Sequence, residues 1–208
     1  MNKPNFKSEQ EKFWAGEFGD QYQSRNPENF EFGSRAALFS RILSRTGPLN
    51  SIIEFGPNIG NNLKVLRLMQ PQAKLTGVEI NVQAAQRLQA WGQAEVINQS
   101  ILDFKPARSW DMGFVSGVLI HINPDFLAEV YRQLYTVALR YICLIEYYNP
   151  VPVEMNYRGH AGKLFKRDFC SEIIGLYPNL KMLDYGFVYH RDPVFPLDDL
   201  TWFLLEKR

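Results

Sequence analysis

The sequence feature that most constrains the fold is an alternation of short apolar runs with helix-patterned segments, which extends from residue 51 to residue 147. Apolar runs typical of strands occupy residues 51–55, 74–80, 95–98, 110–115 and 140–147. Between some of them, apolar side chains recur at the spacing of a helix, in the segments 60–70, 82–91 and 125–138. Such alternation is typical of strand–helix–strand units. We therefore predict an α/β fold, with a parallel sheet covered by helices on both faces.

The last part of the chain breaks this alternation. Two strand-like segments, LKMLDYGFVYH (180–190) and LTWFLLEKR (200–208), follow each other with only a loop between them. A loop of about ten residues is short for a right-handed crossover between parallel strands, so we expect these segments to pair antiparallel. The predicted sheet is Rossmann-like, mostly parallel and seven-stranded, with an antiparallel C-terminal edge hairpin. We interpret residues 148–167 as an irregular polar connection, followed by a short helix from Asp168.

The N-terminal part of the chain has a helical pattern over residues 8–46. Ser8 and Glu11 have the spacing of a capping box, and Gly47-Pro48 suits the end of a helix. We predict one compact domain overall, in which residues 1–47 form a helical cap or lid and residues 48–208 form the Rossmann-like domain.

Composition and charge narrow the class of protein. Of 208 residues, 46% are hydrophobic, which is enough for one substantial core. The net charge of +1 favours neither a nucleic-acid partner nor an anionic membrane surface. No apolar stretch approaches the roughly 18 residues of a membrane span, and the start lacks a signal-peptide pattern. Cys143 and Cys170 match no metal spacing. We expect a cytoplasmic protein without a metal ion, whose oligomeric state the sequence does not indicate.

The segment EFGPNIGNN (54–62) joins the first strand to the next helix, which is where open α/β sheets usually bind ligands. Gly56 allows a tight turn, and Gly60 would let the backbone approach a ligand closely. A P-loop is excluded because Gly60 is followed by Asn61-Asn62 instead of Lys and Ser or Thr. A dinucleotide turn is disfavoured because Asn58 replaces the central glycine and because the Glu54 carboxylate would repel a phosphate.

S-adenosylmethionine is the remaining ligand, since it carries an ammonium group and a carboxylate but no phosphate. Its ammonium can face Glu54, while its carboxylate can bind helix N–H groups near Gly60. Glu79 ends the second strand 23 positions after Gly56, close to the spacing of an acid that binds ribose hydroxyls. Ser100 and Ile101 follow the third strand, where the adenine ring is expected.

Several longer motifs resemble those of one enzyme family. These motifs are FWAGEFGDQYQSRN, EFGPNIGNN, GVLIHINPD, EYYNPVPVEMNYRGH, KLFKRDF and YGFVYHRDPVFPLDDLTWFLLEKR, and they extend from Phe13 to Arg208. The chain resembles the class I S-adenosylmethionine-dependent methyltransferases, and within them the pseudaminic acid biosynthesis-associated methylase family. The G-x-N-x-G form of that family matches Gly56 to Gly60, so Asn58 fits its pattern.

The resemblance implies a methylase acting on a nonulosonic, pseudaminic-type sugar or its nucleotide-linked intermediate, with S-adenosylhomocysteine as product. In related methyltransferases an aromatic N-terminal segment covers the cofactor, which implies roles for Tyr22 and Arg25. Gly117 and Val118, which open the segment after the fourth strand, complete the expected cofactor site.

Candidate acceptor-site residues follow the fourth and fifth strands. His121 can act as a general base or bind a substrate by a hydrogen bond, and packing beside the cofactor is the alternative. Tyr147, Tyr148 and Asn149 end the fifth strand, with Tyr148 as a second catalytic candidate. A cationic and aromatic cluster then follows, which either clamps a carboxylate or phosphate or is a solvated loop: Tyr157, Arg158, His160, Lys163 and Arg167. His190, in the final loop, can close the far side of the pocket.

Other functions remain open from the sequence. The same scaffold can methylate another small metabolite or a peptide amine, at O or at N. A nicotinamide-dependent oxidoreductase and a binding module without turnover are alternatives of a different class. The partner we expect is a small molecule.

Overall fold

The computed structural model of the chain describes residues 6–208, so the first five residues of the predicted cap lie outside the described range. Its helices are α1 Glu9–Ala15, α2 Glu17–Arg25, α3 Phe32–Leu43, α4 Asn61–Met69, α5 Val82–Trp91, α6 Leu127–Val137 and α7 Phe169–Leu176. Two short 3-10 helices are η1 Leu119–His121 and η2 Pro124–Phe126. The strands are β1 Ser51–Phe55, β2 Lys74–Glu79, β3 Glu95–Asn98, β4 Trp110–Ser116, β5 Ala138–Glu146, β6 Val153–Tyr157, β7 His160–Lys166, β8 Leu180–Phe187 and β9 Thr201–Lys207.

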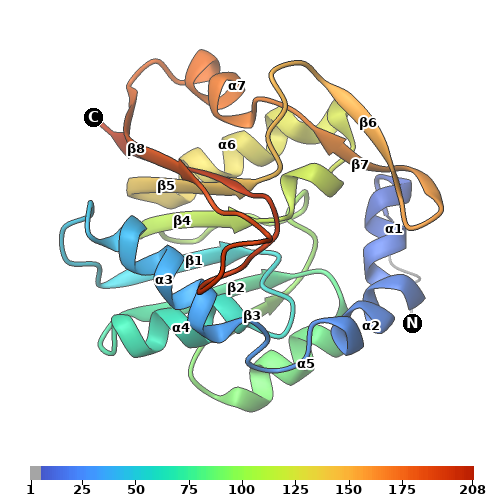
Figure 1. The fold of residues 1–208 in the computed structure, drawn as a ribbon, viewed down its shortest axis with the longest axis horizontal. Helices are drawn as coiled ribbons and strands as arrows, with labels where there is room; N and C mark the ends of the chain where they lie inside the picture. The colour runs from blue at the N-terminus through green and yellow to red at the C-terminus, as the bar shows by residue number, and fades with distance from the viewer. Residues whose placement is uncertain (1–5) are drawn as a thin grey trace.

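The main sheet has seven strands in the order β3-β2-β1-β4-β5-β9-β8 (Figure 1). Strands β1 to β5 pair in parallel, whereas β9 pairs antiparallel with both β5 and β8. The predicted Rossmann-like sheet with an antiparallel C-terminal hairpin is therefore confirmed.

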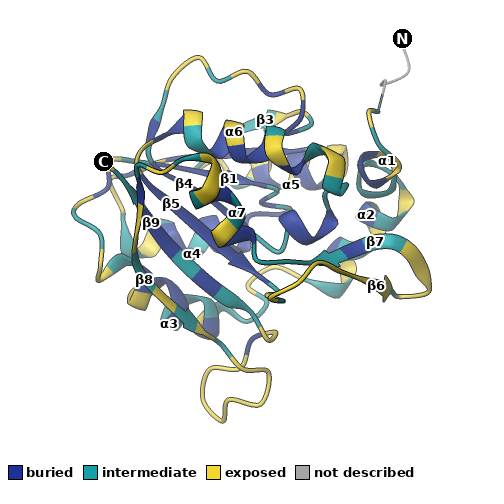
Figure 2. Cartoon of the chain, turned by 90° about the horizontal axis from the view of Figure 1, so that it is seen from above, coloured by how far each residue is buried: buried dark blue, intermediate teal, exposed yellow. Residues whose placement is uncertain are grey.

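The core lies on both faces of this sheet, because successive side chains of a strand point to opposite sides. In β1, Ile52 packs into the layer that contains Phe39 of α3, and Ile53 packs into the layer that contains Val130 of α6. Figure 2 shows the buried central strands between these helical layers. Burial on both sides explains why the parallel strands appear in the sequence as continuous apolar runs.

The expectation for residues 148–167 is wrong, because this segment contains an antiparallel hairpin formed by β6 and β7. Tyr157 pairs with His160, and between them Arg158 and Gly159 have φ angles of 52° and 87°. Positive φ at both positions of a two-residue turn matches the twist of a hairpin. The side chains of β6 are largely exposed, so no apolar run marked the strand.

Helix α1 and the β6–β7 hairpin lie side by side at one end of the sheet (Figure 1). The Gln10 side-chain amide donates to the Gly162 carbonyl over 2.8 Å, and the rings of Phe13 and His160 lie 5.0 Å apart. The predicted capping box is present, since the Ser8 hydroxyl accepts from the Glu11 N–H. Within residues 6–208, no helix combines the length and apolarity needed to cross a bilayer.

Candidate functional site

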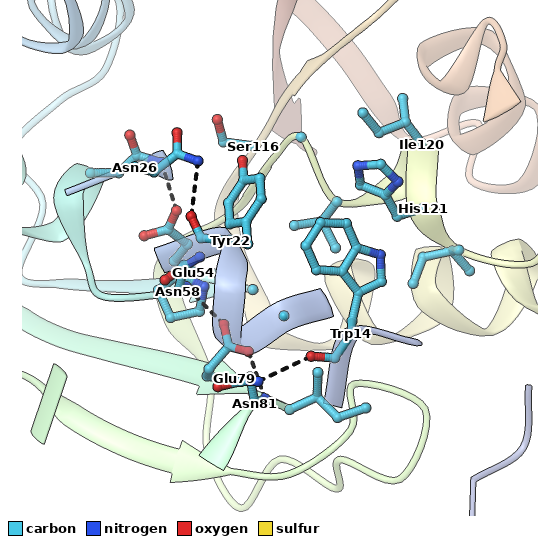
Figure 3. A pocket seen from close by; sticks show the side chains of 18 of the residues that line it. Trp14, Tyr22, Asn26, Glu54, Asn58, Glu79, Asn81, Ser116, Ile120 and His121 are labelled. Atoms are coloured by element: carbon cyan, nitrogen blue, oxygen red, sulfur yellow. Dashed lines mark hydrogen bonds between the residues drawn. The ribbon is translucent and has the colours of Figure 1, made fainter. Parts of the chain in front are cut away.

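A cavity of about 370 Å³ opens at the carboxyl ends of the parallel strands. Residues that end or follow β1, β2, β4 and β5 line it, together with side chains from α1 and α2. Figure 3 shows Trp14 and Tyr22, from these two helices, between Glu54 on one side and His121 on the other. The strand ends and the N-terminal helices thus enclose one site.

The glycine turn between β1 and α4 requires left-handed backbone at three positions. The φ angles are 71° at Gly56, 52° at Asn58 and 83° at Gly60. A Cβ at Gly56 would lie 2.6 Å from Val118 Cγ2, so this glycine allows the two strand-end turns to meet. The expected role of Gly60 differs from the observed one: its Cα faces Leu88 of α5, and Gly60 does not line the cavity.

Glu54 ends β1 with a carboxylate that is only 1% exposed. Its Oε1 accepts a 2.7 Å hydrogen bond from Asn62, while its Oε2 is buried with no partner among the described residues. Burial raises the pKa of Glu54 to about 8. A buried carboxylate oxygen without a partner is costly, so the cavity is suited to a cation or hydrogen-bond donor at this point.

Glu79 ends β2 and is 6% exposed. Its Oε2 accepts from the Asn58 N–H over 2.7 Å, and its Oε1 accepts from the Asn81 N–H over 2.8 Å. Burial raises the pKa of Glu79, and these backbone donors oppose the rise. Since each carboxylate oxygen has a second lone pair, Glu79 can still accept two hydrogen bonds from a ligand. The bond from the Asn58 N–H also helps to hold that residue in its left-handed conformation.

The turn after β3 contains Ser100 and Ile101, which are predicted to lie beside the adenine ring. The Ser100 hydroxyl donates to Glu11 of α1 and accepts from the Leu102 N–H, so it ties α1 to the turn. Ser100 and Ile101 both line the cavity. The Ser100 hydroxyl is therefore engaged within the protein, which leaves backbone groups to meet a ligand here.

His121 is 8% exposed and lies on the cavity wall. Its Nδ1 is 2.6 Å from the Lys163 carbonyl oxygen. A carbonyl only accepts, so Nδ1 carries the proton and Nε2 presents a lone pair. Burial lowers the pKa of His121 to about 4, so the ring is neutral at pH 7. The centroid of its ring lies 4.6 Å from the ring centroid of Trp14 and 4.8 Å from that of Tyr157.

Glu146, at the end of β5, is a positioning residue that the sequence analysis missed. Its Oε1 accepts from the Val118 and Leu119 N–H groups, each over 2.9 Å. These bonds fix the segment that leads into His121. Burial raises the pKa of Glu146 to about 7, against the effect of these backbone donors.

Three tyrosines and one acid gather at the end of the cavity next to β5. Tyr22, Tyr147, Tyr157 and Asp198 all line it. Burial and then the nearby Asp198 carboxylate raise the pKa of Tyr147, and burial and Tyr157 raise that of Tyr22 to about 12. Asp198 was missed because it lies in a loop. Its position follows from the antiparallel register, in which Thr201 of β9 pairs with Glu146 of β5.

The sequence-predicted site residues fall into two groups. Those that line the cavity are Tyr22, Glu54, Gly56, Asn58, Glu79, Ser100, Ile101, Gly117, Val118, His121, Tyr147, Tyr157 and Arg158. Those outside its lining are Arg25, Gly60, Tyr148, Asn149, His160, Lys163, Arg167 and His190. Within the second group, Arg25 is distinctive, because its Nε and Nη2 are buried with no partner among residues 6–208.

Charged side chains at the cavity also include one that no motif indicated. Arg35 of α3 donates to Asn62 over 2.7 Å and to the Phe30 carbonyl over 3.1 Å, and it lies 3.5 Å from Glu31. Its donors are thus engaged inside the protein. Of the predicted cationic cluster, only Arg158 reaches the cavity.

No protein-family model matches the chain, and no match is found among curated protein sequences. The pseudaminic acid-associated family therefore stays a prediction.

Comparison with solved structures gives a consistent result. The 1,6-didemethyltoxoflavin-N1-methyltransferase of Burkholderia thailandensis, solved with S-adenosylhomocysteine, has a TM-score of 0.69 at 14% identity and covers 100% of this chain and 93% of that one. Magnesium protoporphyrin IX methyltransferase from Synechocystis has a TM-score of 0.67 at 14% identity over 95% and 97% of the two chains. The N-methyltransferase NodS from Bradyrhizobium japonicum has a TM-score of 0.61 at 15% identity over 85% and 96%. At these identities the comparisons establish the fold, and that fold is the Rossmann-like fold of S-adenosylmethionine-dependent methyltransferases.

Proposed function

We propose that this protein is a cytoplasmic S-adenosylmethionine-dependent methyltransferase that acts on a small molecule. The observation that carries the proposal is the pair of buried side chains Glu54 and Glu79 at the ends of neighbouring strands. They flank the glycine turn, where an acidic side chain disfavours a phosphate group. When bound, S-adenosylmethionine supplies an electrophilic methyl group.

The residues of the cavity fit this cofactor chemically. The unpartnered Glu54 Oε2 suits the ammonium group, and the two oxygens of Glu79 suit the ribose hydroxyls. The Ile101 segment offers backbone groups for an adenine edge. A nicotinamide dinucleotide fits less well, because its pyrophosphate would face Glu54 at the turn where it should bind.

Arg25 is a candidate for the carboxylate of the same ligand. Its guanidinium lies over the rings of Phe18 and Tyr22, at 4.8 Å and 5.5 Å, and two of its nitrogens lack partners among the described residues. Burying such donors without a partner is unfavourable.

Within the predicted cap of residues 1–47, α1 and α2 are proposed as the part that covers this site, whereas α3 packs into the core through Phe39. Helices α1 and α2 contribute Gln10, Trp14 and Tyr22 to the cavity wall, and α1 contacts the β6–β7 hairpin. A wall of this kind excludes water from a reaction whose main requirement is in-line placement of the acceptor.

For the acceptor, the sequence motifs favour a nonulosonic, pseudaminic-type sugar or its nucleotide-linked form. Arg158 is the one predicted cationic side chain that lines the cavity and so supports an anionic group on the substrate. Incubation of nonulosonic acids and their cytidylyl derivatives with S-adenosylmethionine, followed by mass spectrometry, tests this choice through a gain of one methyl group. Another small metabolite or a peptide amine is the alternative acceptor.

Calorimetric titration tests the cofactor site. We expect S-adenosylhomocysteine to bind, and Glu79→Ala to weaken binding by about 1.5–3 kcal/mol, the scale of hydrogen bonds to a charged group. Glu95→Ala removes an exposed carboxylate on β3 and serves as the matched control, with unchanged affinity. A thermal-shift titration in which NADH raises the melting temperature of the protein and S-adenosylhomocysteine does not would contradict the proposal.

A further inference from the structure

We propose that the acceptor group is an amine, which enters as an ammonium ion and is recognised by Asp198 and by the surrounding aromatic residues. This inference rests on the proposed methyltransferase function and assigns the chemical class of its second substrate. It concerns the end of the cavity that lies beyond the cofactor residues.

The position of this end follows from the strand order. The expected cofactor residues lie after β3, β2, β1 and β4, which are consecutive in the sheet. The next strands are β5 and β9, and they contribute Tyr147 and the Asp198 loop to the same cavity. An acceptor placed beside the methionine end therefore meets Tyr147, Asp198 and the side chains facing them.

The charges at this end favour a cation. Asp198 lies near Glu31 as well as Tyr147: burial raises the pKa of Glu31, the Arg35 guanidinium opposes that rise, and the Asp198 carboxylate adds to it. Arg35 lies 3.5 Å from Glu31 and compensates its charge, so the exposed Asp198 carboxylate is the acid available to a ligand at this end. Of the two arginines, Arg35 has its donors engaged, and Arg158 is exposed at the hairpin turn, with its guanidinium 5.9 Å from the Tyr157 ring.

The predicted clamp for an acidic substrate is largely absent from the cavity. His160, Lys163, Arg167 and His190 do not line it. Aromatic side chains take their place, since Trp14, Tyr22 and Tyr157 line the wall. Ring faces attract ammonium ions, so this lining suits an amine better than a carboxylate. A sugar would satisfy the site if it carried an amino group.

His121 adds a second, independent indication. Its buried ring lines the cavity, and because Nδ1–H is bound to the Lys163 carbonyl, Nε2 is the nitrogen that can accept a hydrogen bond. An amine nitrogen has N–H groups for such an acceptor. Because burial makes His121 a weak base, it is unsuited to removing the proton of an alcohol, whereas an ammonium ion loses its proton to water far more readily than an alcohol does.

The transfer to nitrogen balances without a further reactant. The ammonium first loses one proton to solvent water, while Asp198 acts only in recognition. The lone pair of the neutral amine then forms the N–CH3 bond. The C–S bond breaks with its electron pair left on sulfur, so the positive charge moves from sulfur to nitrogen.

The test uses three probes of similar size, namely benzylammonium, benzyl alcohol and benzoate. Each is titrated into the full chain saturated with S-adenosylhomocysteine, so that Glu54 is already occupied. We expect benzylammonium to bind about tenfold more tightly than the other two. Asp198→Asn should remove this preference. Asp199→Asn, which removes a charge from the same loop and keeps an oxygen for the His190 N–H, should retain it.

The outcomes separate the two proposals. Failure of S-adenosylhomocysteine to bind would refute the methyltransferase function itself. Binding of S-adenosylhomocysteine with no preference for benzylammonium, or with a preference that survives Asp198→Asn, would overturn the amine acceptor alone.

Discussion

At the scale of single residues, Glu54 links cofactor binding to pH. Burial holds its pKa at about 8, so at pH 7 the ligand-free protein carries Glu54 mostly protonated. An ammonium ion beside it favours the charged form. Binding of S-adenosylhomocysteine should therefore release a proton, and its affinity should rise from pH 6 to pH 8 by at most about tenfold per pH unit.

Calorimetry in buffers of different ionisation enthalpy measures this proton release. Glu54→Gln is the control, because it keeps the shape of the side chain and has no proton to lose. Equal proton release in the variant, or an affinity that does not change between pH 6 and pH 8, would show that Glu54 does not face the ammonium group.

His121 should affect turnover more than cofactor binding. Its ring faces the acceptor end, so His121→Ala is expected to lower kcat by about 10–100-fold, through lost hydrogen bonding and a misplaced acceptor. The dissociation constant of S-adenosylhomocysteine should stay within about twofold, because His121 lies apart from Glu54 and Glu79. His160→Ala is the matched control, since that ring packs on Phe13 outside the cavity. An unchanged kcat in His121→Ala would leave the residue a packing role only.

At the scale of elements, Trp14 joins the N-terminal helices to the β6–β7 hairpin. Its ring packs against His121 at 4.6 Å and Tyr157 at 6.3 Å. Trp14→Ala should weaken this packing by about 1.5–3 kcal/mol, the scale for burying a large side chain. Amide exchange in β7 should then speed up while exchange in β1 stays slow. Tyr185→Ala, at an exposed ring on β8, should change neither. An equal increase in amide exchange across all elements of Trp14→Ala would argue against a separate cap.

The strands of the main sheet could be predicted from the sequence, whereas the β6–β7 hairpin could not. The strands of the sheet were predictable because burial on both faces imposes apolar runs, as at Ile52 and Ile53. Glu54 and Glu79 were predictable because parallel strands bring their carboxyl ends to one edge. The β6–β7 hairpin was not, since its exposed strands carry no apolar pattern and its turn at Arg158 is set by backbone conformation.

Side chains that strand pairing or helix packing brings to the site could not be predicted from the sequence either. Asp198 lies in an ordinary loop, and only the antiparallel pairing of β9 with β5 brings it to the cavity. Glu146 looks like any strand residue until its carboxylate meets the backbone N–H groups before His121. The hydrogen bond from the Ser100 hydroxyl to Glu11 of α1 joins segments far apart in the chain, so no local pattern indicated it.

At the scale of the whole molecule, buried ionisable groups should set the pH range of stability. The folded-state pKa values of Glu54 and Glu146, about 8 and about 7, lie above the ordinary value of 4.5. Between pH 4.5 and the folded-state pKa of each acid, the folded protein binds more protons than the unfolded chain. The stabilisation that the two protonated acids contribute is therefore complete below pH 4.5 and is lost as the pH rises through 7 and 8. His121 acts in the opposite direction, since its folded pKa of about 4 lies below 6.5. Its contribution is present above pH 6.5 and is lost as the pH falls toward 4.

Above pH 6.5 the two acids therefore act without opposition from His121. The free energy of unfolding of the ligand-free protein should fall between pH 6.5 and pH 8, by about 1 kcal/mol per pH unit. Urea unfolding at half-unit steps measures this slope. Glu54→Gln should flatten it above pH 7, where Glu146 has already ionised, and saturating S-adenosylhomocysteine should do the same because the ammonium partner keeps Glu54 charged. A stability that rises over this interval would mean that the two carboxylates are solvated or paired in the folded protein, and the cavity would then lack the buried acid on which the cofactor site depends.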